Sequence, residues 1–268
     1  MGIVKGEGLM NRIIAIIQAR VGSTRLPNKV LLDLEGKTVL EHVINRVSKS
    51  KLVSETAVAT TVLEEDLKIV NLCSGKGVRV YCGSEDDVLD RFYEAARLFG
   101  ADHIVRVTAD CPLIDYKVID DVLSLHLNNK SEYTSNIIEE TFPDGEDIEV
   151  LTFEVLKRIW QDAKLSSERE HVTPYIRKRP GIFKLSNLAC GKDLSEKRWT
   201  LDEERDYNFI KIIYNALYKK NKFFGIKEIL EFLKAHPEYE KINSRIGRNE
   251  GYLKSVKNDR KIPKEDRP

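Results

Sequence analysis

Two absences, of long hydrophobic runs and of paired cysteines, exclude several classes of protein at once. No stretch approaches the roughly 18–20 apolar residues that a helix needs to cross a bilayer, and residues 1–12 lack the apolar core of an export signal. The four cysteines form no C-x-x-C pair and have no histidine partner at zinc-ligand spacing. We therefore expect a cytoplasmic protein with reduced thiols, no membrane association and no transition-metal site.

The sequence also lacks an excess of charge of either sign. Its 44 Lys and Arg residues face 43 Asp and Glu residues, which leaves a formal net charge of +1. No global field attracts the protein to nucleic acid or to an anionic membrane, so any anion binding must be local. The 268 residues suffice for one large domain or for a domain with an appended lobe.

Strand and helix patterns alternate through the first 130 residues. Residues 13–17 form an unbroken apolar run, typical of a strand covered on both faces. Residues 38–47 carry apolar side chains at helical spacing. The same reading predicts strands at 56–60, 78–82 and 103–108 and helices at 64–73, 86–99 and 118–127. This order predicts right-handed βαβ crossovers and an α/β fold with a mainly parallel, Rossmann-like sheet flanked by helices.

The rhythm changes after about residue 130. Short strands are expected at 133–137 and 147–150, around the turn Pro143-Asp144-Gly145. Further helices are expected at 152–163, 168–177, 203–218 and 226–233, and strands at 183–188 and 198–201. The short strands and mixed order indicate a small inserted α+β lobe.

A basic loop, residues 18–29, follows the first predicted strand. Loops beyond the carboxyl ends of strands line the ligand crevice of an open α/β sheet. Arginine and lysine side chains there can clamp phosphate oxygens and stabilise the charge of a leaving pyrophosphate. The loop is neither a Walker A sequence nor a G-x-G-x-x-G turn, and a solvated basic loop is the alternative. Its cations are Arg20, Arg25 and Lys29, and Ala19, Gly22 and Ser23 offer close backbone approach and a hydroxyl group.

This stretch resembles the signature of the CMP-sugar synthetases, the acylneuraminate and deoxy-octulosonate cytidylyltransferases, whose A-R-x-x-S-x-R-L-P-x-K loop wraps the triphosphate of CTP. Arg20, Ser23, Arg25 and Lys29 fall on the matching positions. Within that group, the chain is most similar to the branch named for spore coat polysaccharide biosynthesis. The segments that carry this similarity are residues 83–92, 108–115, 142–150, 168–175 and 248–252.

The resemblance implies a GT-A-type nucleotidyltransferase domain over residues 12–258. Its expected parts are a nucleotide-binding half (12–130), the lobe as a sugar-binding and dimerisation insertion (131–197) and a closing metal-site segment (198–258), with loose tails at 1–11 and 259–268. It further implies transfer of CMP from CTP to an acidic, nonulosonate-like sugar, with release of pyrophosphate, for surface polysaccharide synthesis. A homodimer is the implied assembly.

Two aspartates are the candidate ligands of a magnesium ion. Asp110 follows the strand predicted at 103–108, where an unpaired carboxylate would be costly without a cation. Its alternative role is a turn or helix cap, and Asp115 is the better candidate for a cap. Asp202 follows a second short apolar segment and could instead be an N-cap. The resemblance places Asp110 and Asp202 together as the Mg²⁺ ligands, with Asp206 as a less certain third position.

The remaining candidates recognise the base and the acceptor. Backbone groups near Thr60 and Thr61 could bind cytosine, and so could Asp87 or Arg91, although the i, i+4 spacing of these two fits a surface ion pair equally well. Gly83 belongs to the same region. Acceptor binding is assigned to Asp147 and Glu149, expected to share one face of a strand, and to His171 and Arg198; Arg169 and Arg177 are further available cations. His171 could equally be a packing or capping residue, and the two acids could merely face solvent.

Three rival functions are weighed. A GT-A-like glycosyltransferase would carry a D-x-D motif after a strand, where this chain has Thr-Ala-Asp110-Cys. A nucleotidyltransferase for another sugar or a sugar phosphate would keep the same basic loop. A non-catalytic nucleotide-binding module would have no need to retain three cations and both candidate metal aspartates.

Overall fold

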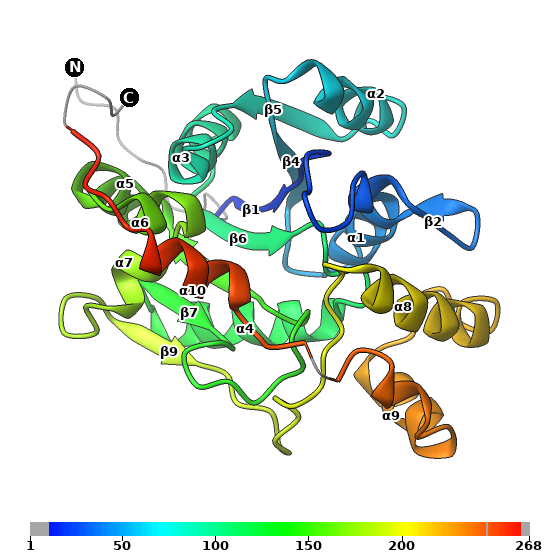
Figure 1. Cartoon of the computed structure of the whole chain (residues 1–268). Coiled ribbons are helices and arrows are strands. Elements are labelled where there is room, and N and C mark those ends of the chain that lie inside the picture. Colours follow the sequence, from blue (N-terminus) through cyan, green and yellow to red (C-terminus); the bar gives the residue numbers. More distant parts are fainter. Residues whose placement is uncertain (1–10, 245, 264–268) are drawn as a thin grey trace.

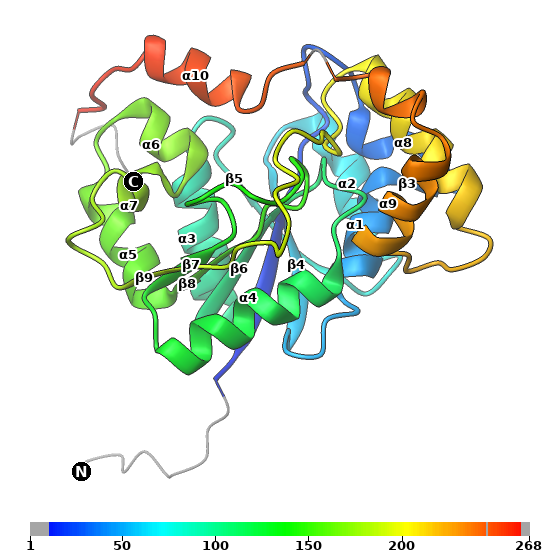
Figure 2. The ribbon, with the colours of Figure 1, turned by 90° about the horizontal axis from the view of Figure 1, so that it is seen from below.

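A seven-stranded sheet with helices on both faces forms the frame of the computed structural model, which describes residues 11–244 and 246–263 (Figures 1 and 2). Its strand order is β5-β4-β1-β6-β8-β7-β9. Neighbouring strands from β5 to β6 pair in parallel. These four are β1 (Ile13–Gln18), β4 (Glu55–Thr61), β5 (Arg79–Gly83) and β6 (His103–Thr108). The predicted mainly parallel α/β sheet is confirmed.

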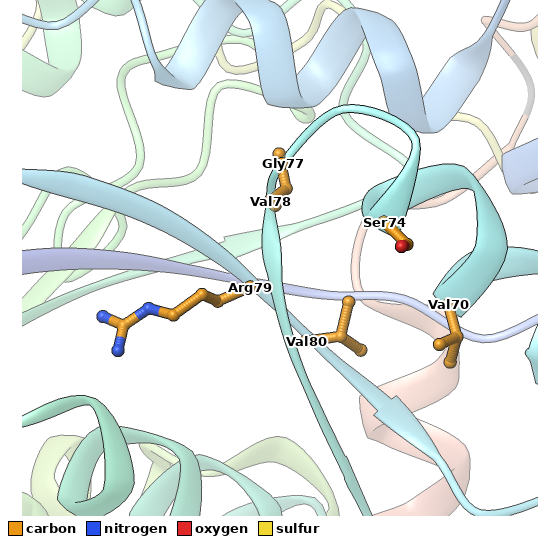
Figure 3. A pocket seen from close by; sticks show the side chains of 6 residues that line it. All are labelled: Val70, Ser74, Gly77, Val78, Arg79 and Val80. Carbon is orange, nitrogen blue, oxygen red and sulfur yellow. The ribbon is translucent and has the colours of Figure 1, made fainter.

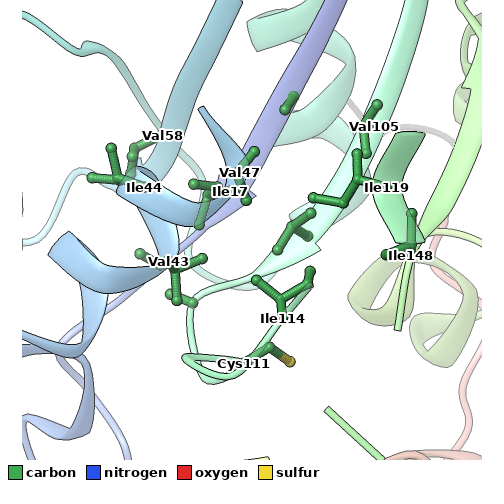
Figure 4. Close-up of a cluster of buried hydrophobic side chains, with 14 of the residues drawn as sticks. Ile17, Val43, Ile44, Val47, Val58, Val105, Cys111, Ile114, Ile119 and Ile148 are labelled. Carbon is green, nitrogen blue, oxygen red and sulfur yellow. The ribbon is translucent and has the colours of Figure 1, made fainter. Parts of the chain in front are cut away.

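The apolar run of β1 is buried on both sides, as its sequence predicts. Ala15 and Ile17 belong to a core cluster that also contains residues of α1 (Val39–Val47). Figure 4 shows Ile17 in this cluster. Ile14 and Ile16 point to the opposite cluster, which contains the apolar face of α3 (Val88–Phe99). Each such isoleucine contributes about 1.5–3 kcal/mol of burial free energy, so β1 anchors the centre of the sheet.

Side chains at the helix starts define where the helices begin. Thr38 and Glu41 form a reciprocal capping box on α1, and Asp87 caps α3 by accepting from the backbone N–H of Asp90. Asp115 caps α4 (Tyr116–Asn129), which confirms its predicted role. The expected helix 64–73 begins as a 3-10 turn, Glu64–Asp66, and continues as α2 (Leu67–Ser74).

The strands after residue 130 extend the central sheet. They are β7 (Tyr133–Ser135), β8 (Glu149–Thr152) and β9 (Leu185–Asn187). β8 pairs antiparallel with β6 and with β7, and β7 pairs parallel with β9. Of the seven strands, therefore, only β8 runs in the opposite direction. The strands of the expected inserted segment therefore join the central sheet, and Val150 and Leu151 of β8 are buried in the two clusters that cover the rest of it.

The single helix expected at 168–177 is two short helices, α6 (Ser166–His171) and α7 (Pro174–Arg177). Between them Val172 adopts φ 69° and ψ −59°, and the N–H of Thr173 donates to the carbonyl of His171 at 2.8 Å. Pro174 has no N–H with which to continue the first helix. The preceding helix, α5 (Phe153–Asp162), was predicted within one residue at each end.

The remaining helices are α8 (Glu204–Leu217), α9 (Ile226–Ala235) and α10 (Glu250–Lys257). α8 and α9 share a third apolar cluster with Trp199. α10 was not predicted; it lies across α6 and α7 (Figure 1). We call residues 248–262 the C-terminal strap.

The strap is held at its far end, because Asp259 accepts from the N–H of Ser167 at 3.0 Å and Ile262 donates to the carbonyl of Lys164 at 2.8 Å. The expected loose tail is therefore wrong for residues 259–262. Residues 1–10 and 264–268 of the two expected tails lie outside the described residues. No helix in the described part of the chain is long and apolar enough to cross a membrane.

Candidate active site

The loops that follow β1, β4, β5 and β6 meet at one edge of the sheet, because these strands are parallel. Ala19, the first residue after β1, donates its N–H to the carbonyl of Ala59 in β4 at 3.1 Å. On the other side, Ala109 donates to the carbonyl of Gln18 at 3.0 Å. The basic loop is thus fixed between the end of β4, which contains Thr60 and Thr61, and the loop that contains Asp110.

Asp66 ties the first two loops together, and sequence reasoning missed it. Its carboxylate accepts from the N–H of Val21 at 2.6 Å, and from both the N–H (3.3 Å) and the hydroxyl of Thr61. The side chain is buried. The available signal was an acidic residue at the start of a predicted helix, directly after a strand end.

The two candidate metal aspartates lie together, bridged by Lys29. The Lys29 ammonium nitrogen is 2.7 Å from Asp110 Oδ2 and 2.9 Å from Asp202 Oδ1, and it also donates to the carbonyl of Leu201 at 2.9 Å. Arg25 reaches the same Asp202 oxygen at 2.9 Å. The sequence assigned Lys29 to the triphosphate, and the structure shows it between the aspartates.

An extended segment brings Asp202 to Asp110. Leu201 donates its N–H to the carbonyl of Asp110 at 2.8 Å, and Trp199 donates to the carbonyl of Asp144 at 2.6 Å. Gly145 permits this approach, because a Cβ atom there would lie 2.6 Å from the backbone of Thr200. The expected strand at 198–201 is wrong, since the segment pairs with loops through a single bridge instead of with a strand of the sheet.

Arg198 holds the acidic residues in place. Its buried guanidinium donates twice to Asp206, and to Asp144 at 2.9 Å and Asp202 at 3.0 Å. Asp206 is fully buried and also accepts from the N–H groups of Asp202 and Glu203 and from Asn243. Arg198, which was expected to bind substrate, therefore positions Asp202. Both carboxylate oxygens of Asp206 are occupied by these contacts. Glu203, not Asp202, is the residue before α8.

The electrostatics follow from these contacts. Burial disfavours the charge of Lys29, but Asp110 and Asp202 outweigh it and raise its pKa. Burial likewise opposes ionisation of Asp110, yet Lys29 lowers the pKa of this carboxyl to about 2. Asp144 differs, because its burial outweighs Arg248 and Arg198 and raises its pKa to about 6. At neutral pH the site therefore holds ionised Asp110 beside ammonium Lys29.

The outer part of the basic loop is more exposed. Arg20 pairs with Glu85 at 3.2 Å, and both side chains are more than two-fifths exposed. A Cβ atom on Gly22 would lie 2.9 Å from Glu65 Oε1, and the Ser23 hydroxyl accepts from the N–H of Leu26 at 3.4 Å. Arg20 and Arg25 are therefore accessible to a phosphate ligand.

The proposed ion pair between Asp87 and Arg91 is not formed in the described structure. Asp87 instead binds Arg169 at 2.6 Å, and Arg91 donates to the carbonyl of Ser84 at 3.0 Å. Burial, together with nearby Arg20, lowers the pKa of Arg91 to about 10. Gly83 packs against Arg91, since a Cβ atom on Gly83 would lie 3.2 Å from its Cγ. The loop after β5 is thus held by two buried guanidinium groups, those of Arg91 and Arg169.

The two acidic candidates for acceptor binding, Asp147 and Glu149, make separate sets of contacts. Asp147 lies before β8, outside the strand on which it was expected, and it pairs with Arg248 at 2.8 Å. Glu149 begins β8; its buried carboxylate binds Arg106 and accepts from Tyr133 and Thr173. The expectation of two acids alternating on one strand is therefore wrong.

His171 contacts the C-terminal strap. Its Nε2 is 3.0 Å from the Ser255 hydroxyl, and its ring meets that of Tyr252 edge to face at 5.2 Å. Burial lowers its pKa, so the ring is neutral at pH 7. These contacts match the packing role that the sequence left open as its alternative.

An open pocket lies between α2 and the start of β5 (Figure 3). The candidate loops lie at the other end of this strand. The lining of the pocket is mostly small and apolar: Val70, Ser74, Gly77, Val78, Arg79 and Val80. It contains none of the candidate residues. The candidate functional centre is therefore the carboxyl-end edge with Lys29, Asp110 and Asp202.

The protein-family model described as cytidylyltransferase matches residues 14–248, which include every candidate residue above. The chain belongs to the cytidylyltransferase family. As a cytidylyltransferase, it is 32% identical over 236 residues to the spore coat polysaccharide biosynthesis protein SpsF of Bacillus subtilis, covering 85% of this chain and 97% of that one. It is also 42% identical over 241 residues to an uncharacterised protein of Methanocaldococcus jannaschii, covering 88% and 96%.

A solved structure and a relative that matches over part of its length agree with this cytidylyltransferase assignment. A cytidylyltransferase structure from Leptospira borgpetersenii superposes with a TM-score of 0.81 at 35% identity, over 86% of this chain and 97% of that one. A shorter match, 42% identical over 114 residues, joins 42% of this chain to 44% of the 3-deoxy-manno-octulosonate cytidylyltransferase of Geobacter sulfurreducens.

Proposed function

We propose that this cytidylyltransferase transfers CMP from CTP to an acidic, nonulosonate-like sugar, releases pyrophosphate and serves surface polysaccharide synthesis. The observation that carries the proposal is the cluster that Lys29 of the basic loop forms with Asp110 and Asp202. The names of the Bacillus and Geobacter relatives support the polysaccharide and the acidic sugar.

In the proposed reaction a sugar hydroxyl oxygen attacks the α-phosphorus of CTP. The new P–O bond forms as the bond to the β-phosphate oxygen breaks, the hydroxyl proton passes to water, and pyrophosphate leaves. Arg20, Arg25 and Lys29 bind the triphosphate oxygens and offset the charge that grows on pyrophosphate. Because Arg25 and Lys29 now contact Asp202, binding CTP requires both side chains to exchange a carboxylate for a phosphate partner.

Mg²⁺ fits the donor set that this exchange would free. Asp110 and Asp202 supply two hard carboxylate oxygens, both within 2.9 Å of the one cation that bridges them, and Mg²⁺ takes one or two carboxylates together with phosphate and water oxygens. A bound Mg²⁺ would neutralise phosphate charge at this position. Arg198 keeps Asp202 oriented toward it by holding Oδ2.

The base would lie along the loops after β4 and β5, near Ala19, Thr60, Thr61 and Gly83. Thr60 supports this placement, because its buried hydroxyl has no hydrogen-bond partner among the described residues. Arg91 and Asp87 shape the same wall. These assignments are part of the proposal.

The test is pyrophosphate release with each nucleoside triphosphate, Mg²⁺ and a panel of keto-acid sugars, neutral sugars and sugar phosphates. We expect release with CTP and a keto-acid sugar. Release only with a sugar phosphate or another nucleotide, or with no pair, would refute this function. In the active pair, Asp110→Asn should lower turnover at least about 100-fold with a cooperative thermal transition preserved; unchanged turnover would remove Asp110 from the centre.

A further inference from the structure

Glu149 forms the centre of a polar cluster on the α3 side of the sheet. Arg106 from β6 binds Glu149 and also donates to the side-chain oxygen of Gln18 at 2.9 Å. The hydroxyls of Tyr133 (2.6 Å) and Thr173 both donate to Glu149 Oε1. Because Gln18 is the first residue of the basic loop, this cluster adjoins the triphosphate side of the candidate centre.

A second guanidinium, that of Arg177, lies close to the same carboxylate. Arg177 is the last residue of α7, and Glu149 and Tyr133 are the groups that most favour its charge. Among the described residues it has no ion-pair partner, and its buried Nε has no hydrogen-bond partner. Its guanidinium carbon lies over the face of the Tyr252 ring, 5.8 Å from the ring centroid. One carboxylate therefore faces two guanidinium groups, and only that of Arg106 forms an ion pair with it.

A buried guanidinium nitrogen without a hydrogen-bond partner is costly, because its lost hydration is not replaced. The fold nevertheless places Arg177 here through a strained turn. Val172 has the φ and ψ of a classic γ-turn, closed by the hydrogen bond from Thr173 to His171. A β-branched residue in that conformation persists only where the surroundings demand it, and such strain is concentrated at functional sites.

The strained turn has two results. It places the Thr173 hydroxyl on Glu149, and it starts α7 at Pro174, so that Arg177 ends beside the cluster. The C-terminal strap closes the other side with Tyr252, and the contact of Ser255 with His171 holds it there. Tyr252 lies beyond residue 248, where the family match ends.

We propose that Arg177 binds the carboxylate of the acceptor sugar, with Tyr252 of the strap as the facing wall and Arg106 as the link to the basic loop. Arg177 is thus a specificity-determining residue that separates acidic acceptors from neutral ones. The inference rests on the proposed function. The same guanidinium chemistry could also receive a phosphate of CTP, and the kinetics distinguish the two sources.

The experiment compares the unchanged protein with Arg177→Gln, and with Arg158→Gln as a matched control on the exposed face of α5. Pyrophosphate release is measured with CTP and the best keto-acid sugar of the panel, and again with the methyl ester of that sugar. We expect Arg177→Gln to raise the KM for the acid about 10- to 100-fold, the loss of a charge-assisted hydrogen bond, and to leave the KM for CTP unchanged. Arg177→Lys should recover part of the loss.

The outcomes are separable. An unchanged KM for the acid overturns the inference and leaves the proposed function intact, and so does an equal change for acid and ester. A raised KM for CTP assigns Arg177 to the nucleotide and also overturns it. If no acid of the panel is a substrate, the proposed function fails, and the same acids are titrated calorimetrically into both proteins. Absence of binding that depends on Arg177 then refutes the inference as well. Thermal unfolding of each variant identifies any that fails to fold.

Discussion

Lys29 offers the sharpest test of the centre, because this one side chain forms ion pairs with two acids. Replacement by methionine keeps the aliphatic length and removes the charge between Asp110 and Asp202. The Asp110 pKa of about 2, against an ordinary value of 3.8, is a shift of about 1.8 units. At about 1.4 kcal/mol per unit, this shift stabilises the fold by about 2 kcal/mol at neutral pH.

The direction with pH follows from the lowered pKa of Asp110. Such a group stabilises the fold when it is ionised, so its contribution is complete above pH 3.8 and is lost as the pH falls through about 2. Urea unfolding should therefore show Lys29→Met to be about 2 kcal/mol less stable than the unchanged protein at pH 7, and about 1 kcal/mol less stable at pH 3. Lys68→Met, on the exposed face of α2, is the matched control and should change little.

A divalent cation provides a second measurement on the same variant. With Lys29 gone, the two carboxylates lack their bridging cation, so millimolar Mg²⁺ or Mn²⁺ should raise the free energy of unfolding of Lys29→Met more than that of the unchanged protein. Equal stabilities of the two proteins at pH 7, together with equal responses to Mn²⁺, would show that Lys29 does not occupy the position at which a metal ion binds.

Two further predictions concern groups outside this cluster. His126 forms hydrogen bonds with His103 and Thr134, and burial, helped by His103, lowers its pKa to about 4. Its contribution to stability is complete above pH 6.5, so the free energy of unfolding should fall by about 2 kcal/mol between pH 8 and pH 5. In urea titrations His126→Gln should reduce this pH dependence, and an unchanged pH dependence would contradict the burial argument. Arg169→Leu leaves Asp87 without its partner at the start of α3, so the KM for CTP should rise several-fold more than the KM for the acceptor. The measurement is steady-state kinetics with both substrates varied. An equal rise of the two KM values would show that Arg169 does not act through the loop after β5.

The first half of the fold could be predicted because its signals are local. The apolar run of β1 and the periodicity of α3 each specify burial on a stated face, and hydrophobic burial dominates there. The direction of β8 has no such signal, since a four-residue strand takes its direction from the strands beside it. The break between α6 and α7 had one visible sign, Pro174, but the conformation of Val172 depends on tertiary contacts.

The candidate centre divides along the same line. The basic loop could be found from its charge and its position after a strand, but its pairing of Lys29 with Asp110 and Asp202 joins residues 81 and 173 positions apart. Arg198 was assigned to the substrate because an acidic sugar calls for cations, and its positioning role could not be predicted because its three carboxylate partners come from two separate segments. Resemblance supplied the pair of aspartates, and only the structure supplied the cation between them.

Because these residues are so far apart in the sequence, the candidate centre can form only in a completely folded chain. A chain in which only the first two parallel strands have formed already carries Arg20, Arg25 and Lys29 and can attract a polyphosphate through charge alone. It has neither aspartate in place, because Asp202 arrives only when the carbonyl of Asp110 accepts the N–H of Leu201. The cluster of Lys29, Asp110 and Asp202 therefore forms only in molecules whose two halves have closed on each other.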